Sequence, residues 1–440
     1  MSRAVTSQAE AGPVLVTGGS GFIGSHVVDV LQREGHVPRI FDLEASTFHD
    51  RRDVETVVGD LTNARALARA MAGCRLVVHL AAAADVSEVE SDPVEAERRN
   101  ARGTLAVLEA ARRAGVERVV YASTIWVYSD VDLDAVDEDT PLRPPAHLYT
   151  ATKLAGELYC RSYRALYGLE YTILRFGIPY GPRARPTAVI PRFVEKALAG
   201  EALTVAGDGS QSRSFVYVED LADGVVRALS PLAAGRTYNL AGCEQVTVLE
   251  IAEAVRERVA RVPIECIEGR AGDFRGATVS SDRAERDLGW TASTPFAEGL
   301  RRYVDWHLAA TAPRAPVRRG LPTAAILGAI LLGVWVLAAL GGLAVVDAVA
   351  DGLGLAAPLI WVAILLIPLV VAAIGPATGR RACWGLAGAE LAVAVLPWPG
   401  ALGRVGHAHQ VLLLLAALLA VAAAHAAGRG GLLRPAAGRS

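Results

Sequence analysis

A tyrosine and a lysine four positions apart are the residues of this sequence with the clearest chemical potential. They bound the stretch YTATK, and Lys153 is one of only two lysines in a chain with 44 basic residues. On a helix, positions i and i+4 share a face, so the side chains of Tyr149 and Lys153 can approach each other. A free tyrosine has a pKa of about 10, but an adjacent ammonium stabilises its phenolate. The spacing therefore predicts a catalytic base, Tyr149, with Lys153 as its partner.

Two hydroxyl residues, Ser123 and Thr124, close an apolar run that reads as a strand, VERVVYAST. Hydroxyls at a strand end can hold a substrate oxygen while a nearby base removes its proton. An ordinary strand-end turn is the alternative explanation of the same two residues. We predict Thr124, Tyr149 and Lys153 as the catalytic residues. Ser123, Thr124 and Tyr149 are expected to contact the substrate.

Three glycines near the start of the chain, Gly18, Gly21 and Gly24, separate a strand pattern from a helix pattern in VLVTGGSGFIGSHV. Such glycines allow a tight turn, and the helix N-terminus offers free N–H groups and positive potential to a pyrophosphate. A tight turn alone would also explain the spacing. The next apolar strand ends at Asp42, whose carboxylate can accept hydrogen bonds from an adenosine ribose and would repel a 2′-phosphate. A dinucleotide site for NAD rather than NADP is predicted, with a plain strand-end turn as the alternative for Asp42.

Further residues fit the same cofactor. Asp60 and Leu61, in VVGDLTN after a third strand, are expected at the adenine edge. A lysine suits position 153 because its compact ammonium fits between the nicotinamide ribose and the phenol of Tyr149. The positive nicotinamide ring of oxidised NAD also stabilises a phenolate.

The elements that must position these residues alternate along the first 310 residues. Short apolar runs such as VPRIFDL and RLVVHLAA are separated by helical patterns, which predicts a parallel, doubly wound α/β sheet. A net charge of −2 gives no reason to expect nucleic acid as a partner. The five cysteines are scattered without CxxC spacing, so we expect neither a disulfide framework nor a metal site, and a reducing compartment fits.

The end of the chain has a different composition. Residues 311–322 read as a proline-rich basic linker. Four apolar segments follow, each near the ~20 residues that cross a bilayer, at roughly 323–346, 355–374, 382–398 and 410–427. Arginine clusters precede the first segment, join the second to the third and follow the fourth, which places both termini in the cytoplasm. We predict an all-α four-helix transmembrane region over 323–428 and a cytoplasmic tail over 429–440, with a soluble helical bundle as the alternative.

Eight motifs in one order carry a resemblance to a known family. They are TGGSGFIG, GDLTN, HLAA, NARGTLAVLEAA, YTATK, LRFGIPYGP, a long segment over 189–224 and RAGD. Over about 14–309 the chain resembles an extended short-chain dehydrogenase/reductase of the NAD-dependent epimerase/dehydratase family, whose members act on nucleotide sugars. The resemblance implies a catalytic domain over 1–310. It would comprise a Rossmann-like NAD-binding part over about 12–175 and a smaller C-terminal substrate-binding lobe over about 176–310.

The resemblance also implies roles for single residues. Thr124 would bind the reacting sugar oxygen, Tyr149 would be the base and Lys153 its partner. Arg213, Arg270 and Asp273 would bind the diphosphate and nucleoside of the substrate, and an arginine fork suits a diphosphate chemically. The expected cofactor contacts are Gly18, Gly21, Phe22, Ile23, Gly24, Asp42, Asp60, Leu61, Ala81, Ala82, Asn100, Tyr149 and Lys153.

The sequence departs from the family pattern directly after Thr124. The 4,6-dehydratases typically carry Asp-Glu there and the decarboxylating members resemble them in having Glu, whereas this chain has Ile125 and Trp126. Ile178 and Ser214 also replace a common Asn and Asp, so the sugar pocket is expected to differ. Without an acid–base pair after Thr124, dehydration and decarboxylation are disfavoured.

We therefore expect a UDP-sugar 4-epimerase that oxidises a sugar carbinol transiently. A net dehydrogenase or reductase of another sugar or of a lipid or sterol-like alcohol is one alternative, and a non-catalytic NAD-binding membrane scaffold is another. The expected partners are a nucleotide-diphosphate sugar, the lipid bilayer and membrane glycosyltransferases. By analogy with relatives, a homodimer is expected through the helices predicted over 100–115 and 149–168.

Overall fold

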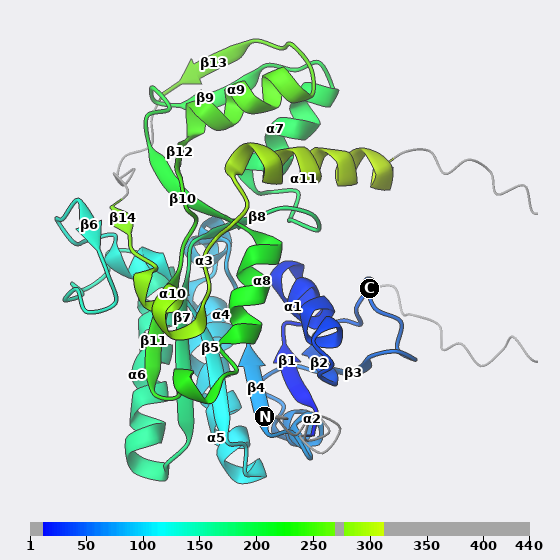
Figure 1. Ribbon diagram of the computed structural model, residues 1–440, viewed down its shortest axis with the longest axis vertical. Helices are drawn as coiled ribbons and strands as arrows, with labels where there is room; N and C mark the ends of the chain where they lie inside the picture. Colours follow the sequence, from blue (N-terminus) through cyan, green and yellow to red (C-terminus); the bar gives the residue numbers. More distant parts are fainter. Residues whose placement is uncertain (1–11, 269–276, 312–440) are drawn as a thin grey trace, which may run out of the picture. The chain divides into compact units, whose positions relative to one another are not determined.

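The computed structural model describes residues 12–268 and 277–311 (Figure 1). The predicted linker, membrane spans and tail lie outside these residues, as do the predicted substrate contacts Arg270 and Asp273. In the described part of the chain, no helix is both long and apolar enough to cross a bilayer, and no three metal-ligating side chains lie close enough together to hold an ion. The four-helix membrane region therefore stays a prediction.

A seven-stranded sheet forms the centre of the fold, in the order β11-β7-β5-β4-β1-β2-β3 (Figure 1). Every neighbouring pair in it is parallel. The strands are β1 (Val14–Thr17), β2 (Pro38–Asp42), β3 (Glu55–Val58), β4 (Leu76–His79), β5 (Arg118–Thr124), β7 (Glu170–Phe176) and β11 (Arg236–Leu240). The chain moves outward from β1 to β3 and then crosses to β4, which creates a crevice at the carboxyl ends of β1 and β4. The predicted doubly wound parallel sheet is confirmed.

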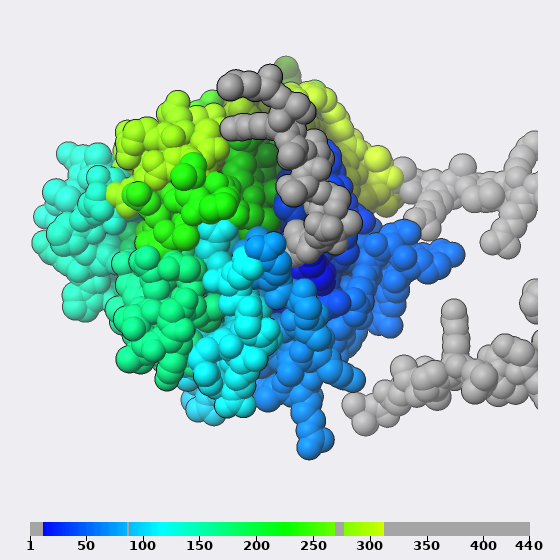
Figure 2. Space-filling model, turned by 60° about the horizontal axis from the view of Figure 1, so that its bottom comes forward, coloured from blue at the N-terminus to red at the C-terminus, as the bar shows by residue number. Residues whose placement is uncertain are grey.

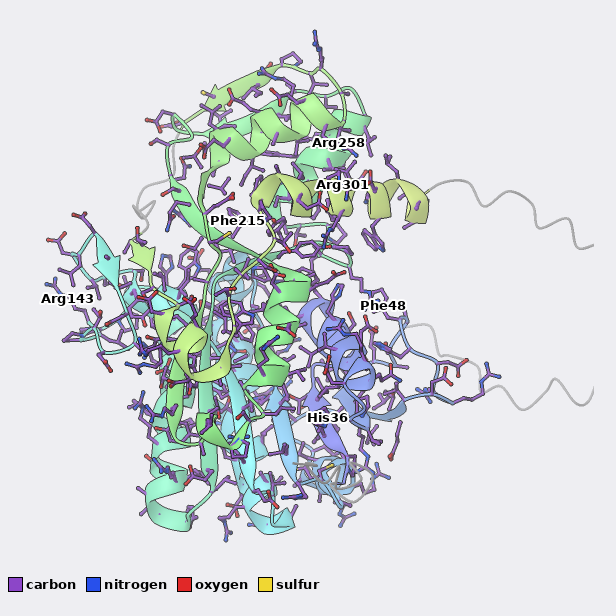
Figure 3. All side chains as sticks on the ribbon, in the orientation of Figure 1. His36, Phe48, Arg143, Phe215, Arg258 and Arg301 are labelled. Carbon is purple, nitrogen blue, oxygen red and sulfur yellow. The ribbon has the colours of Figure 1, made fainter. Side chains whose placement is uncertain are left out.

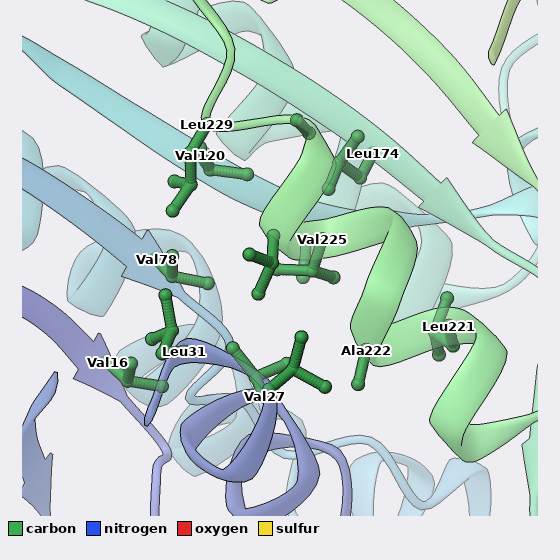
Figure 4. Packing of buried hydrophobic residues seen from close by; sticks show 14 of the residues in the cluster. Val16, Val27, Leu31, Val78, Val120, Leu174, Leu221, Ala222, Val225 and Leu229 are labelled. Atoms are coloured by element: carbon green, nitrogen blue, oxygen red, sulfur yellow. The ribbon is translucent and has the colours of Figure 1, made fainter. Parts of the chain in front are cut away.

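Helices cover both faces of this sheet because its strands are apolar on both sides. Val14 and Val16 belong to one buried cluster and Leu15 to the other, as the alternation of side chains along a strand requires. Helices α1 (Phe22–Arg33) and α8 (Val218–Arg227) pack on the first face, where Val27, Leu31, Leu221 and Val225 meet the strands (Figure 4). The second face packs against α2 (Ala64–Met71), α5 (Gly103–Ala114) and α6 (Leu148–Tyr167).

A smaller lobe is built mainly from residues after β7. Its core contains aromatic residues such as Phe215, which Figure 3 labels where β10 runs between the two lobes. The elements of this lobe are β8 (Ile178–Tyr180), α7 (Val189–Leu198), β9 (Leu203–Ala206), β10 (Ser212–Tyr217), β12 (Gln245–Thr247), α9 (Val248–Arg258), β13 (Ile264–Ile267) and α11 (Phe296–Thr311). Strands β8, β10 and β12 form one small sheet and β9 with β13 another.

The two lobes are not consecutive segments of the chain. After β10 the chain returns to the central sheet as α8 and β11, and α10 (Asp282–Leu288) packs against β11. A short parallel pair, β6 (Ala135–Val136) with β14 (Thr278–Val279), adds a further connection. The seventh strand of the nucleotide-binding sheet thus comes from the half of the domain that the sequence pattern assigned mainly to the substrate lobe. The remaining short elements are α3 (Val86–Ser91), α4 (Pro93–Glu97), η2 (Arg98–Arg102), η3 (Ile125–Tyr128) and η4 (Pro231–Ala233).

Candidate active site

The three predicted catalytic side chains lie together where β5 ends and α6 begins. Thr124 is the last residue of β5, and its hydroxyl is hydrogen-bonded to the phenol of Tyr149 in the first turn of α6. Lys153, one turn further along α6, is 5% exposed, and its Nζ donates to the carbonyl of Ala122 at 3.0 Å. A hydroxyl, a phenol and an ammonium therefore surround one strand end, which is the arrangement that the spacing of YTATK predicts.

Burial governs the ionisation of the tyrosine and the lysine. It raises the pKa of Tyr149 to about 12, against the opposing effects of the Arg185 charge and the Thr124 hydrogen bond. It lowers the pKa of Lys153 to about 8. The cation that favours the phenolate in this structure is Arg185, whereas the Lys153 ammonium is held by a backbone carbonyl. The acidification of Tyr149 by Lys153 therefore stays a prediction.

Arg185 was not identified from the sequence. It is an exposed residue on the loop that joins β8 to α7, three positions after the motif LRFGIPYGP. The same loop reaches the segment after β4, because the Thr187 hydroxyl donates to Asp85 at 3.5 Å. Since Tyr149 packs against Ala83 and Val89 of that segment, the loop and the phenol share one neighbourhood. Its signal in the sequence was weak because arginine is the commonest basic residue of this chain.

The glycine loop between β1 and α1 has no room for side chains at two positions. Gly18 has a φ of +74°, and a Cβ there would lie 2.8 Å from the backbone nitrogen of Ala81. A Cβ on Gly24 would lie 2.0 Å from the carbonyl oxygen of Gly18. Gly21 caps α1, whose first residues are Phe22 and Ile23. The loop thus brings the unpaired N–H groups at the start of α1 to the carboxyl end of β1, where a pyrophosphate would lie.

Asp42 ends β2 beside this loop, as predicted. Its carboxylate accepts hydrogen bonds from the backbone nitrogens of Ser20 at 2.9 Å and Leu43 at 2.7 Å. Burial raises the pKa of Asp42 despite these hydrogen bonds. The carboxylate therefore borders the same crevice as the start of α1, in the position expected for a contact with an adenosine ribose. A tight cradle followed by this carboxylate fits NAD.

The loop after Asp42 is fastened to α1 by charged groups. Asp29 of α1 pairs with His49 at 2.8 Å and with Arg183 at 2.8 Å. The Arg183 guanidinium lies 4.7 Å from the ring centre of Phe48, which Figure 3 labels on this loop. These contacts hold one border of the crevice in place, and their partners are too far apart in sequence to have been recognised as a unit.

Asp60 and Leu61 follow β3 and take part in contacts within the protein. The Asp60 carboxylate pairs with Arg98 at 3.0 Å and accepts the backbone N–H of Thr62 at 2.7 Å. The Arg98 guanidinium lowers the pKa of Asp60 to about 2. Leu61 packs closely against Gly103, where a Cβ would lie 2.9 Å from its side chain. The adenine contact expected of Asp60 and Leu61 stays a prediction.

A buried histidine supports the segment that carries Ala81 and Ala82. His79, at the end of β4, contacts the hydroxyls of Thr17 at 2.7 Å and Thr104 at 3.0 Å. Burial, and next the charge of Lys153, lower its pKa to about 3, so the imidazole is neutral at physiological pH. It joins β4 to the strand before the glycine loop. The motif HLAA drew attention to the alanines, while the role of its histidine emerged only from the fold.

Asn100 connects the segment after β4 to the catalytic helix. It lies on η2, a π-helical turn, a feature that often marks functional sites. Its amide oxygen accepts the N–H of Ala83 at 2.7 Å, and its nitrogen donates to the Ala83 carbonyl at 2.9 Å and to the Thr152 hydroxyl at 3.0 Å. The Thr152 hydroxyl in turn donates to the carbonyl of Tyr149 at 2.7 Å. In this geometry Asn100 positions the catalytic tyrosine.

Ser123 has a different place from the one expected. Its hydroxyl donates to Glu157 at 2.7 Å, and Glu157 forms a buried ion pair with Arg175 at 2.9 Å. Neighbouring residues of a strand point to opposite sides, so Thr124 is the one of the two hydroxyls that meets the phenol. Ser123 therefore supports the strand end from behind, and its predicted contact with substrate has no counterpart in this geometry.

Arg213 reaches a small pocket beside the catalytic residues. Its guanidinium lies 5.9 Å from the ring centre of Trp126, and the ring of His147 meets the same indole edge-to-face at 5.5 Å. The described residues that line this pocket are Ile125, Trp126, Tyr128, Ser129, Ile178, Arg213, Ser214, Gln245, Ala277 and Val279. The departures from the family pattern, Ile125, Trp126, Ile178 and Ser214, are thus gathered around one cavity.

Comparison with known proteins agrees with this site. Residues 14–241 match the model of the NAD dependent epimerase/dehydratase family. A UDP-glucose 4-epimerase of Mycolicibacterium smegmatis is 35% identical over 306 residues, which cover 66% of this chain and 97% of that protein. A dTDP-glucose 4,6-dehydratase of Streptomyces griseus is 33% identical over 308 residues, covering 67% and 93%.

Solved structures show the same likeness. The UDP-glucose 4-epimerase of Thermus thermophilus in complex with NAD has a TM-score of 0.62 and 34% identity, covering 68% of this chain and 99% of its own. MoeE5 in complex with UDP-glucose and NAD has a TM-score of 0.63 and 33% identity, with the same coverage. Together with the glycine cradle and Asp42, these neighbours identify NAD as the cofactor. The chain therefore belongs to the NAD-dependent epimerase/dehydratase family.

Proposed function

We propose that this protein is a nucleotide-sugar 4-epimerase that acts on a UDP-sugar. Identity alone does not choose among activities, because an epimerase, a 4,6-dehydratase and a zebrafish UDP-glucuronic acid decarboxylase are all 32–35% identical to the chain. The observation that carries the proposal is the pair Ile125 and Trp126 after Thr124. Both line the pocket at the catalytic strand end, and no carboxylate is among the described residues of that lining.

Removal of water or of carbon dioxide from a sugar is helped by an acid or base in addition to the one that acts on the carbinol. At the position next to Thr124 this chain instead offers an aliphatic and an indole side chain. The Trp126 backbone N–H donates to the Thr124 hydroxyl oxygen at 3.2 Å, so this apolar pair is attached directly to the catalytic strand end. These contacts favour oxidation at the carbinol followed by reduction, without elimination.

The residues of the site divide this chemistry among them. The Thr124 hydroxyl holds the substrate oxygen, and the Tyr149 phenolate takes its proton. NAD, when bound, accepts a hydride from the same carbon and returns it. Lys153 supplies positive charge beneath the phenolate, and its pKa of about 8 keeps it largely protonated at neutral pH. If the sugar turns before reduction, the carbon is inverted and Tyr149 returns the proton. No external oxidant or reductant is consumed.

A product assay tests this function. The purified full chain with NAD is incubated with UDP-glucose or UDP-galactose, and the sugars are separated by chromatography. We expect interconversion, with loss of turnover but retention of NAD binding in Tyr149→Phe. Steady accumulation of NADH without interconversion would instead identify a net dehydrogenase. A dehydrated keto-sugar product would identify a dehydratase.

We also propose that this activity is located at a membrane, with the catalytic domain and both termini in the cytoplasm. The support is the sequence pattern over 323–428, with its four long apolar segments and flanking arginines. The full chain should remain in the membrane pellet after washing with carbonate. Recovery of the full chain in the soluble fraction would refute this location.

Finally, we propose that two copies associate through α5 and α6. These helices pack against each other and lie side by side on the face shown in Figure 2, in cyan and green-cyan. Their outer surfaces carry exposed apolar side chains, which are Leu105, Leu158, Leu166 and Tyr167. Contiguous exposed apolar surface commonly marks an interface. Leu158→Glu should shift the particle mass in light scattering from dimer to monomer, and an unchanged mass would refute this interface.

A further inference from the structure

The pocket beside the catalytic residues has an unusual wall. Of the four residues of η3, Val127 and Tyr128 are buried in a small apolar cluster, whereas Ile125 and Trp126 are only partly buried and face the pocket. Large apolar side chains lose solvation free energy when they stay in contact with water. A partly exposed indole directly after a catalytic hydroxyl is therefore a candidate for contact with a ligand.

Trp126 is held at this position from three sides. Its backbone N–H donates to the Thr124 hydroxyl oxygen at 3.2 Å. Its ring meets His147 edge-to-face, at 5.5 Å and an interplanar angle of 87°, two residues before the catalytic tyrosine. The Arg213 guanidinium of β10 lies 5.9 Å from the ring centre. The indole thus touches the catalytic strand, the start of the catalytic helix and the substrate lobe.

We propose that Trp126 forms the sugar subsite, on which a neutral sugar of a nucleotide-diphosphate sugar lies while Arg213 binds the diphosphate. This inference rests on the function proposed above and narrows its substrate class to sugars without a carboxylate. The electron-rich face of an indole attracts polarised C–H groups and cations. A sugar offers such C–H groups on its less polar face, and a guanidinium is well suited to a diphosphate.

The charges of the pocket determine the selectivity. Among the described residues that line it, Arg213 is the sole charged one. One guanidinium matches one diphosphate, and the sugar then faces Ile125, Trp126 and Ile178. A uronic acid would bring a second anion against these apolar side chains without a second cation, and burying an unpaired carboxylate is costly. Neutral sugars are therefore preferred.

Equilibrium binding to the full chain with NAD tests the subsite, with UDP, UDP-glucose and UDP-glucuronic acid as probes. Trp126→Phe keeps an aromatic face, Trp126→Leu keeps apolar bulk without one, and Trp126→Ala removes both. We expect wild type and Trp126→Phe to bind UDP-glucose about tenfold more tightly than UDP-glucuronic acid, a difference of about 1.4 kcal/mol. Trp126→Leu and Trp126→Ala should lose about tenfold for UDP-glucose but keep their affinity for UDP.

Two outcomes would overturn the subsite. One is unchanged UDP-glucose affinity in Trp126→Leu and Trp126→Ala, with NAD binding showing that both are folded. The other is a wild-type preference for UDP-glucuronic acid. The epimerase assay separates this inference from the function on which it rests. Interconversion by wild type and Trp126→Ala with the same KM would refute the subsite alone, whereas the expected binding pattern without interconversion would refute the epimerase alone.

Discussion

Replacing Glu157 by glutamine should destabilise the protein strongly, because it leaves a buried guanidinium without its carboxylate. Glu157 and Arg175 form an ion pair at 2.9 Å, and both side chains are 3% exposed. Removal of one partner from such a pair typically costs about 3–5 kcal/mol, since the remaining charge stays buried and uncompensated. In a folded unit of a few hundred residues, each kcal/mol lowers the Tm by about 2–4 °C. We therefore expect Glu157→Gln to lower the Tm by roughly 10 °C.

The same change should also affect catalysis. Glu157 accepts the hydroxyl of Ser123 at 2.7 Å and lies on α6, one turn after Lys153. With the pair broken, we expect kcat to fall more than KM rises, because the loss disturbs the position of Thr124 rather than the contacts of the nucleotide.

Two control variants make this test decisive in differential scanning fluorimetry. Glu157→Leu combined with Arg175→Met removes both charges and should recover most of the lost stability. Glu109→Gln breaks the ion pairs of α5 with Arg112 at 2.9 Å and Arg113 at 2.6 Å, which are largely exposed, so its Tm should change little. A Glu157→Gln Tm within about 2 °C of wild type would refute the reasoning. So would a double variant as unstable as the single one.

Three further predictions concern the cofactor and the lysine. Gly24→Ala should weaken NAD binding about tenfold or more, because its Cβ would lie 2.0 Å from the Gly18 carbonyl oxygen, whereas Gly21→Ala, at 3.2 Å, should weaken it less; equal affinities in equilibrium dialysis would contradict this order. Asp42→Asn should lower the ratio of NAD to NADP affinity, because the charge that repels a 2′-phosphate is removed; an unchanged ratio would argue against a ribose contact. The pKa of Lys153 is about 8 in the folded chain against 10.5 for a free lysine, so the unfolded chain binds more protons between these pH values and stability rises from pH 8 toward pH 10. Lys153→Met should flatten this rise in Tm, and a wild-type pH profile in that variant would count against the lowered pKa.

The local patterns of the sequence were sufficient for the layers and the cofactor loop. Alternating apolar runs and helical periods predicted the parallel sheet, because side-chain periods of two and 3.6 are properties of consecutive residues. The spacing of Gly18, Gly21 and Gly24 and the carboxylate at Asp42 identified the cradle for the same reason. The helix spacing of Tyr149 and Lys153 also placed the phenol and the ammonium on one face.

What only the tertiary structure decided involves residues that are distant along the chain. The carbonyl that holds Lys153, the Arg185 charge near Tyr149 and the turn of Ser123 toward Glu157 arise from packing between separate elements. The seventh strand, β11, likewise joins β7 although the small lobe intervenes in sequence. The stack of Arg213 on Trp126 joins the two lobes in the same way. Periodicity reports which face of an element is buried, whereas the partners across that face depend on how whole elements pack, and the charge state of a buried group depends on those partners.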